Sequence, residues 1–354
     1  MDPIEALQTY TLIESPTGDR KALDQLAEVL SADAARAGFH TDREDGHLIW
    51  SRPGGSRPPL LFLSHYDTVW PVGTLRDMPW SVTGDEIKGP GVYDTKAGLA
   101  ALLTASSQTA SLDRGIRVLV VADEEIGSPT ATALVRSEAA KASAVLGLEP
   151  PHPNGDLKTG RRGSTRARVS VTGVESHAAL DPDAGVNAID ELIDQLLRVR
   201  ALVDGRPVLL NTGAITGGGR TNVVAGHAHA DLGLRFLDPD NEKAVLDALQ
   251  ALAPVRPRAE VSASLLAHRP TWRPGDPTLL DHITAIAAAI GQTLSGSPAD
   301  GAADTNTTGA LGIPTVDGLA PRGGGAHARH EWVSAQSITE RVTLLKALMT
   351  SNDL

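Results

Sequence analysis

The sequence contains no cysteine, and this absence limits the chemistry open to the chain. Disulfide bonds, thiolate zinc sites and a cysteine nucleophile are all excluded. Histidine, aspartate and glutamate are therefore the only strong ligands left for a metal ion. Aromatic residues make up only 3% of the chain, so its cores must be built from alanine, valine, leucine and isoleucine.

An excess of basic residues is also absent, because the formal net charge is −11. This charge argues against nucleic acid or an anionic membrane as a partner. No segment approaches the ~20 apolar residues that a membrane span needs. Residues 1–20 contain neither a basic segment nor an apolar stretch of signal-peptide length, so we expect a soluble cytoplasmic protein.

The 354 residues are enough for two domains, and the hydrophobic pattern changes twice along the chain. Apolar runs of strand length first alternate with helical patterns, which predicts a mostly parallel sheet flanked by helices. From Arg166 the strands alternate between apolar and polar residues, which predicts a small α+β domain with helices on one sheet face. The first pattern returns at Thr278. We therefore predict a larger α/β domain of residues 1–163 and 272–354, interrupted by an inserted domain of residues 164–271.

Within the larger domain, the pattern predicts one leading helix, buried strands and four further helices. The predicted strands cover residues 60–63, 118–121, 144–148 and 313–316, and the predicted helices cover residues 96–109, 130–141, 278 onward and 335–349. The first three of these strands are each followed within two residues by an ionisable residue. In open α/β sheets, ligands bind outside the carboxyl ends of the strands. We therefore expect these polar side chains to meet at one edge of the sheet.

The residues that follow the apolar runs or precede a helix are His65, Asp67, Asp94, Glu124, Glu125, Glu149 and His327. If the backbone stays extended after the strand of residues 118–121, Glu124 and Glu125 would point to opposite sides and serve different partners. Collecting uncompensated carboxylates and imidazoles is costly, and divalent metal ions would relieve that cost. Mixed histidine and carboxylate ligands suit zinc, with cobalt or manganese as alternatives, and a short aspartate suits a bridge between two metals. Other histidines, such as His47, we expect at the surface.

Five motifs occur in a fixed order, namely SHYDTVW, GPGVYDTKAG, VVADEEIGS, GLEP and GGGAH. Together they resemble the signature set of the M20 metallopeptidase family, in its glutamate carboxypeptidase and aminoacylase-like branch. The resemblance covers essentially the whole chain. It implies a zinc-peptidase-like α/β catalytic domain with an inserted ferredoxin-like domain that acts as lid and dimerisation domain.

The resemblance also implies a role for each residue at the predicted sheet edge. His65 and Glu149 would bind one zinc ion, Glu125 and His327 would bind a second, and Asp94 would bridge the two. Asp67 would orient His65 through its second ring nitrogen. Glu124 would be the general base that takes a proton from water and delivers it to the leaving amine.

Three residues of the inserted domain match positions that contact substrate in the family. His177 in VTGVESHAA would stabilise an oxyanion, reaching the active site of the partner in a homodimer formed through the insert. Read without the family, His177 is a surface histidine on a polar turn. Asn222 would contact substrate, and Arg235 would clamp a carboxylate.

Glu149 bears on the reaction, because a glutamate at this position accompanies carboxypeptidases and deacylases in the family. We therefore expect hydrolysis of an N-acyl or peptidyl amino acid with a free carboxylate, using two zinc ions per subunit. The alternatives are an aminopeptidase or dipeptidase of the same family and a catalytically silent binding protein. His330 stands where the family pattern has aspartate, and GAADTN, residues 301–306, replaces a loop of the GGxSD type.

Overall fold

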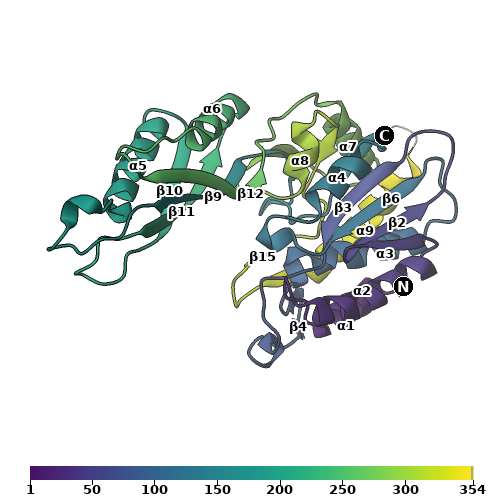
Figure 1. Ribbon diagram of the computed structural model, residues 1–354. Coiled ribbons are helices and arrows are strands. Elements are labelled where there is room, and N and C mark those ends of the chain that lie inside the picture. The colour runs from purple at the N-terminus through teal and green to yellow at the C-terminus, as the bar shows by residue number, and fades with distance from the viewer. Residues whose placement is uncertain (352–353) are drawn as a thin grey trace. The chain divides into compact units, whose positions relative to one another are not determined.

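The computed structural model describes residues 1–351 and 354, which form two compact units (Figure 1). The first unit comprises Met1–Arg161 and Arg273–Leu354, and the second comprises Arg162–Trp272. Along the chain, the second unit is therefore inserted into the first. Among the described residues, no helix is both long enough and apolar enough to cross a membrane.

The first unit is built around a six-stranded sheet. In spatial order its strands are β1 (His40–Glu44), β2 (His47–Arg52), β6 (Ile116–Val121), β3 (Leu60–His65), β7 (Ala144–Gly147) and β14 (Thr315–Val316). The last four are parallel to one another, whereas β1 and β2 form an antiparallel edge. The expected mostly parallel sheet is thus confirmed.

Helices cover both faces of this sheet, namely α1 (Pro3–Leu12), α2 (Arg20–Arg36), α3 (Ala97–Ser107), α4 (Thr132–Ala139), α7 (Thr278–Ala289), α8 (Thr305–Ala310) and α9 (Ala335–Thr350). Successive strand side chains point to opposite faces. Phe62 of β3 accordingly packs in one core cluster with residues of α1, α2, α3, α7 and α9, while Leu61 packs in another with residues of α4. Burial on both faces explains why these strands lack a polar alternation.

The N-terminal part differs from expectation in two respects. Two helices precede the first strand instead of one, because Asp2 caps α1 by accepting hydrogen bonds from the backbone N–H groups of Ile4 and Glu5. The surface position expected for His47 is wrong. His47 is buried in β2, where its Nδ1 accepts a hydrogen bond from the Ala122 N–H at 3.1 Å.

Two small sheets in this unit had no signal in the sequence. One pairs β8 (Leu157–Arg161) with β13 (Gly296–Ala299) in parallel, and the other has the order β15 (Gly323–Gly324), β16 (Trp332–Ser334), β5 (Glu86–Lys88) and β4 (Ser81–Thr83). The second sheet matters for the site. Its pairing of β16 with β5 joins the segment that carries His327 to the segment that leads to Asp94.

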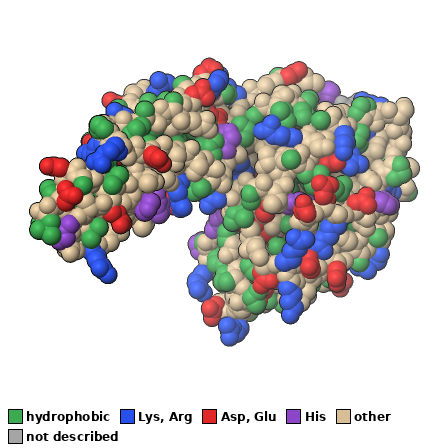
Figure 2. Space-filling model, viewed as in Figure 1, with side chains coloured by type: hydrophobic (Ala, Val, Ile, Leu, Met, Phe, Trp, Pro, Cys, Tyr) green, Lys and Arg blue, Asp and Glu red, His purple; other side chains and the backbone are tan. Residues whose placement is uncertain are grey.

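The second unit has the order of elements expected for a ferredoxin-like fold. Its elements are β9 (Gly163–Thr172), α5 (Ala188–Val203), β10 (Val208–Gly217), β11 (His227–Phe236), α6 (Pro239–Gln250) and β12 (Glu260–Arg269). The strands pair antiparallel in the order β10-β11-β9-β12. Residues of α5 and α6 share one apolar core with inward side chains of the sheet. On the face of the molecule shown in Figure 2, acidic and basic side chains are interspersed, without one large region of either sign.

Candidate metal centre

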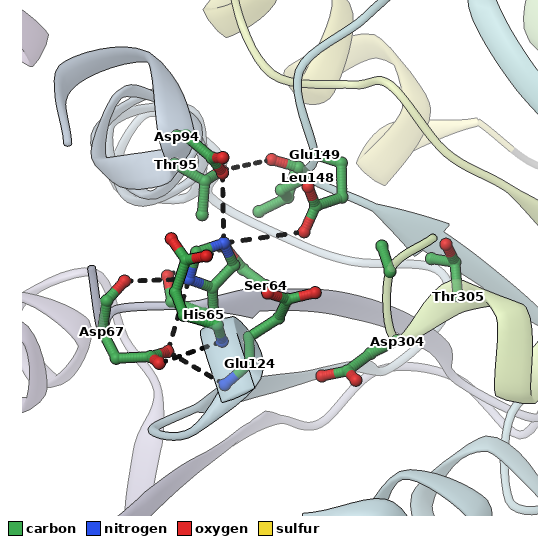
Figure 3. Close-up of polar contacts among 12 residues, drawn as sticks. Ser64, His65, Asp67, Asp94, Thr95, Glu124, Leu148, Glu149, Asp304 and Thr305 are labelled. Carbon is green, nitrogen blue, oxygen red and sulfur yellow. Dashed lines mark hydrogen bonds and ion pairs between the residues drawn. The ribbon is translucent and has the colours of Figure 1, made fainter. Parts of the chain in front are cut away.

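Three parallel strands of the first unit deliver polar side chains to one edge of the sheet. His65 is the last residue of β3, Glu124 and Glu125 lie in the turn after β6, and Glu149 follows β7. Asp94 comes from the segment before α3. Figure 3 shows Asp94, Glu124 and Glu149 around the His65 ring. The sheet topology thus places together residues that are far apart in the sequence.

The first group of ligand atoms surrounds the buried His65 ring. Its Nε2 lies 3.2 Å from Asp94 Oδ1 and 3.7 Å from Glu149 Oε1. Its Nδ1 lies 3.0 Å from the Asp67 carbonyl oxygen and 3.4 Å from Asp67 Oδ1. The side of the ring opposite Asp94 and Glu149 is therefore held by Asp67, which fixes the direction of Nε2.

A second group shares Asp94 with the first. His327 Nε2 lies 3.2 Å from Asp94 Oδ2 and 3.1 Å from Glu125 Oε2. His327 is half exposed and adopts a positive φ of 59° in the loop between β15 and β16. One oxygen of Asp94 therefore faces each histidine. This is the arrangement of a bridging carboxylate between two metal positions.

The backbone at Glu124 and Glu125 is not extended, because a turn of 3₁₀ helix covers Glu124–Ile126. Asp67 forms this turn: its Oδ1 accepts a hydrogen bond from Glu124 N–H and its Oδ2 one from Glu125 N–H, both at 3.2 Å. Gly127 closes the turn with a φ of 96°, a left-handed conformation that glycine adopts without strain. Glu125 reaches the His327 group, while Figure 3 shows the Glu124 side chain beside the His65 ring.

The pKa values in the centre reflect an excess of negative charge. Hydrogen bonds to Asp94 and Glu125 raise the pKa of His327 to about 10. Burial alone would lower the pKa of His65, but hydrogen bonds to Asp67 and Asp94 raise it well above its usual range. Burial, together with the charge of Asp94, raises the pKa of Glu149 to about 7. A site with these shifts stabilises positive charge.

The residues present fit a pair of divalent cations. One ligand atom from each of His65, Asp94 and Glu149 lies within 4.8 Å of the others, and the same holds for Asp94, Glu125 and His327. Glu125 Oε1 is buried and has no hydrogen-bond partner in the part of the chain that the structure describes. A buried carboxylate oxygen without a partner is costly unless a cation sits beside it. Two imidazoles and three carboxylates are the donor set that zinc takes from proteins without thiolates.

The predicted ligand set left out several residues that hold these side chains in place. Thr17 Oγ1 donates to Asp67 Oδ2 at 2.7 Å, and Asp317 Oδ1 accepts from Glu149 N–H at 3.2 Å. Asp317 itself is buried and paired with Arg161 Nη2 at 2.7 Å. Glu331 accepts hydrogen bonds from the segment that carries Asp94. In the sequence it lies four residues after His327.

The three predicted substrate residues of the insert lie in the second unit. His177 and Asn222 occupy adjacent segments, since His177 forms a bridge with Val223 and Asn222 O accepts from Ala178 N–H at 3.0 Å. Both side chains are exposed. Arg235 lies on β11, where its Nη1 donates to Ser164 Oγ at 2.5 Å. All three are therefore on the surface of the second unit and are not part of its core.

Comparison with protein families identifies one family over most of the chain. The model of peptidase family M20/M25/M40 matches residues 61–351. Carboxypeptidase G2 of Pseudomonas sp. (strain RS-16) is 29% identical over 365 residues, covering 98% of this chain and 88% of that protein. Succinyl-diaminopimelate desuccinylase of Caulobacter vibrioides is 32% identical over 261 residues, covering 67% of this chain and 66% of that protein.

Solved structures share the fold along nearly the whole chain. A tripeptidase from Staphylococcus aureus has a TM-score of 0.76 at 21% identity and covers 98% of this chain and 97% of its own. An M20 family metallo-carboxypeptidase from Sulfolobus solfataricus has a TM-score of 0.75 at 16% identity and covers 99% of this chain and 98% of its own. These likenesses concern the fold.

Proposed function

The chain belongs to peptidase family M20/M25/M40 and is a hydrolase of that family, and from this we propose that it cleaves the amide bond of an N-acyl or peptidyl amino acid with a free carboxylate. Family membership confirms the resemblance carried by the five motifs. The observation that carries the proposal is the pair of ligand groups sharing Asp94, with Glu124 beside them.

The proposed reaction divides its tasks between cations and side chains. Two bound zinc ions would lower the pKa of water to ~7 and polarise the carbonyl oxygen of the scissile amide, and cobalt or manganese could substitute. Glu124 takes the proton of the attacking water on its carboxylate and passes it to the leaving nitrogen. Asp67 serves both steps, because it fixes the ring of His65 and the backbone of Glu124.

The substrate class is supported by two observations. The relatives include a carboxypeptidase and a desuccinylase, names that denote release of a C-terminal residue and removal of an acyl group. At the His65 group the third ligand is Glu149, the residue that accompanies such enzymes in the resemblance described above. We also propose that Arg235 binds the free carboxylate of the substrate, because guanidinium and carboxylate form paired hydrogen bonds.

A substrate panel tests this assignment. We expect N-acyl amino acids and dipeptides blocked at the amino terminus to be hydrolysed at least about 10-fold faster, as kcat/KM, than dipeptides with a free amine, a difference of about 1.4 kcal/mol. The liberated amine would be measured with zinc, cobalt or manganese added in turn. Faster release from free-amine substrates would favour an aminopeptidase or dipeptidase, and a metal-loaded protein that hydrolyses none of them would favour a silent binding protein.

We further propose that the chain forms a homodimer through the inserted unit. Strand β10 lies at the edge of its sheet, and edge strands offer unpaired backbone groups to a partner. Large apolar side chains are exposed beside that edge: Ile193 and Leu197 on α5, and Leu209 and Ile215 on β10, are each more than half exposed. Exposed apolar surface next to an open edge is typical of a protein interface.

In such a dimer, we propose that His177 acts in the active site of the partner subunit. Mixing Glu124→Gln and His177→Ala proteins after subunit exchange should then restore activity, up to about one quarter of the wild-type rate for random reassociation. This fraction follows because half of the dimers are mixed and each mixed dimer has one intact site. Activity would be followed with the best substrate of the panel, and exchange would be verified with differently tagged subunits.

The control for this experiment is the double variant Ile193→Asp/Leu197→Asp, which places charges on the proposed interface. It should sediment as a monomer, and recovery of activity should disappear when both inactive proteins carry it. Verified exchange without recovery would contradict a role for His177 in the partner's site.

A further inference from the structure

Glu331 is a buried carboxylate that accepts four hydrogen bonds at the edge of the metal centre. Its Oε1 accepts from the backbone N–H groups of Tyr93 at 2.9 Å and Asp94 at 3.1 Å. Its Oε2 accepts from Gly91 N–H at 2.9 Å and from the indole Nε1–H of Trp70 at 3.0 Å. All four donors lie outside the segment to which Glu331 belongs.

These contacts join three segments that each carry a ligand of the centre. Trp70 follows His65 on the segment after β3, and Gly91 precedes Asp94 on the next. Glu331 lies four residues after His327, in a loop closed by the backbone hydrogen bonds Ala328 N–H to Gly325 O and Glu331 N–H to Ala328 O, both 2.9 Å. One side chain is thus bonded to the segments of both histidines and of the shared aspartate.

We infer that Glu331 is the positioning residue that holds the segment of Asp94 against those of His65 and His327, so that both oxygens of Asp94 face the two metal positions. The inference rests on the proposed metal-dependent function. It adds a residue that touches neither the cations nor the substrate. Partners that orient metal ligands in this way commonly change metal affinity by about 10- to 100-fold when they are removed.

The chemistry of the four contacts explains why a carboxylate is needed here. Every group that faces Glu331 is an N–H donor, so the side chain must accept on both oxygens and donate nothing. An ionised carboxylate does this, whereas a glutamine has one oxygen and one NH₂ group. In either orientation, the NH₂ group of Glu331→Gln would face two N–H donors. Two hydrogen bonds would be lost and two buried donors left unpaired, although the shape of the side chain is kept.

The experiment measures cobalt binding to metal-free protein by calorimetry and by the visible absorption of bound Co²⁺. Glu331→Gln should bind cobalt about 10- to 100-fold more weakly than wild type. The absorption should also change, because the ligands are reoriented. Trp70→Phe removes one of the four donors and keeps the carboxylate, so it should cause a smaller loss in the same direction.

The chain offers a matched control in Glu191→Gln. Glu191 is also a fully buried glutamate and accepts from the N–H groups of Val255 and Arg256 at 2.8 Å, but it lies in the second unit. This variant should lose thermal stability and keep wild-type cobalt affinity and absorption. Loss of cobalt affinity in Glu331→Gln but not in Glu191→Gln would separate positioning of ligands from a general loss of stability.

The outcomes distinguish this inference from the proposed function. Folded Glu331→Gln with wild-type cobalt affinity and absorption would overturn the inference while leaving the metal centre intact. If Glu331→Gln does not fold, unchanged cobalt binding by Trp70→Phe would overturn it in the same way. Wild-type protein that binds no cobalt would overturn the proposed function, and the inference with it.

Discussion

Replacing Glu124 by glutamine is expected to lower kcat by about 10²- to 10⁴-fold while the protein keeps both metal ions. Glutamine has the same shape as glutamate but cannot take a proton from water. The backbone of the turn should not change, because Asp67 bonds to the N–H of residue 124 and not to its side chain. The measurements are kcat on the best substrate of the panel and the metal content per chain by elemental analysis.

The neighbouring glutamate is a matched control for this variant. Glu125 occupies the same turn, but its carboxylate faces His327 Nε2 at 3.1 Å and belongs to a ligand group. Glu125→Gln should therefore lose one metal ion, whereas Glu124→Gln should lose none. A Glu124→Gln enzyme with nearly wild-type kcat would remove Glu124 from the role of general base.

The second large effect is expected at Asp94, the only residue shared by the two ligand groups found among the described residues. Asp94→Ala should weaken the binding of both metal ions by more than the roughly 10- to 100-fold loss of affinity expected when a residue that only orients a ligand is removed. It should also abolish measurable hydrolysis. Its backbone N–H would still bond to Glu331, so the segment itself should remain in place. Metal stoichiometry by calorimetry on the metal-free protein checks this expectation.

Variants of the unshared ligands complete the Asp94 experiment. Glu149→Ala removes a ligand of the His65 group only, and Glu125→Ala removes a ligand of the His327 group only. Each should reduce the stoichiometry from two ions to one, whereas Asp94→Ala should reduce it towards none. Two ions bound to Asp94→Ala with wild-type affinity would contradict a bridging role.

The local pattern of the sequence was sufficient for most of the first unit's sheet. The runs at Leu60 and Val118 are apolar at every position because both faces of β3 and β6 are covered, and such a run can be recognised without knowing its neighbours. The same reasoning places polar residues at the carboxyl ends of strands. This reasoning therefore predicts that His65, Glu124 and Glu149 are neighbours.

Where the prediction was wrong, a distant side chain decided the local structure. The backbone at Glu124–Ile126 turns instead of staying extended, because the Asp67 carboxylate, from the segment after β3, accepts its N–H groups. His47 can be buried because both of its ring nitrogens have partners: the Ala122 N–H just after β6 and the Thr130 side-chain oxygen at 3.0 Å. Neither partner is close in the sequence, so no local propensity could have indicated it.

The sequence by itself determined the fold class, the main strands of the first unit's sheet and the chemical type of the centre, because hydrophobic periodicity and the absence of cysteine can be seen without knowing the fold. Only the tertiary structure decided which oxygen of Asp94 faces which histidine, and that Glu331 holds the Asp94 segment from more than 230 residues away. The physical reason is that a buried carboxylate must find its donors wherever the folded chain supplies them. A buried carboxylate needs hydrogen-bond donors, and which N–H groups donate to it depends on the segments that pack against it in the folded chain.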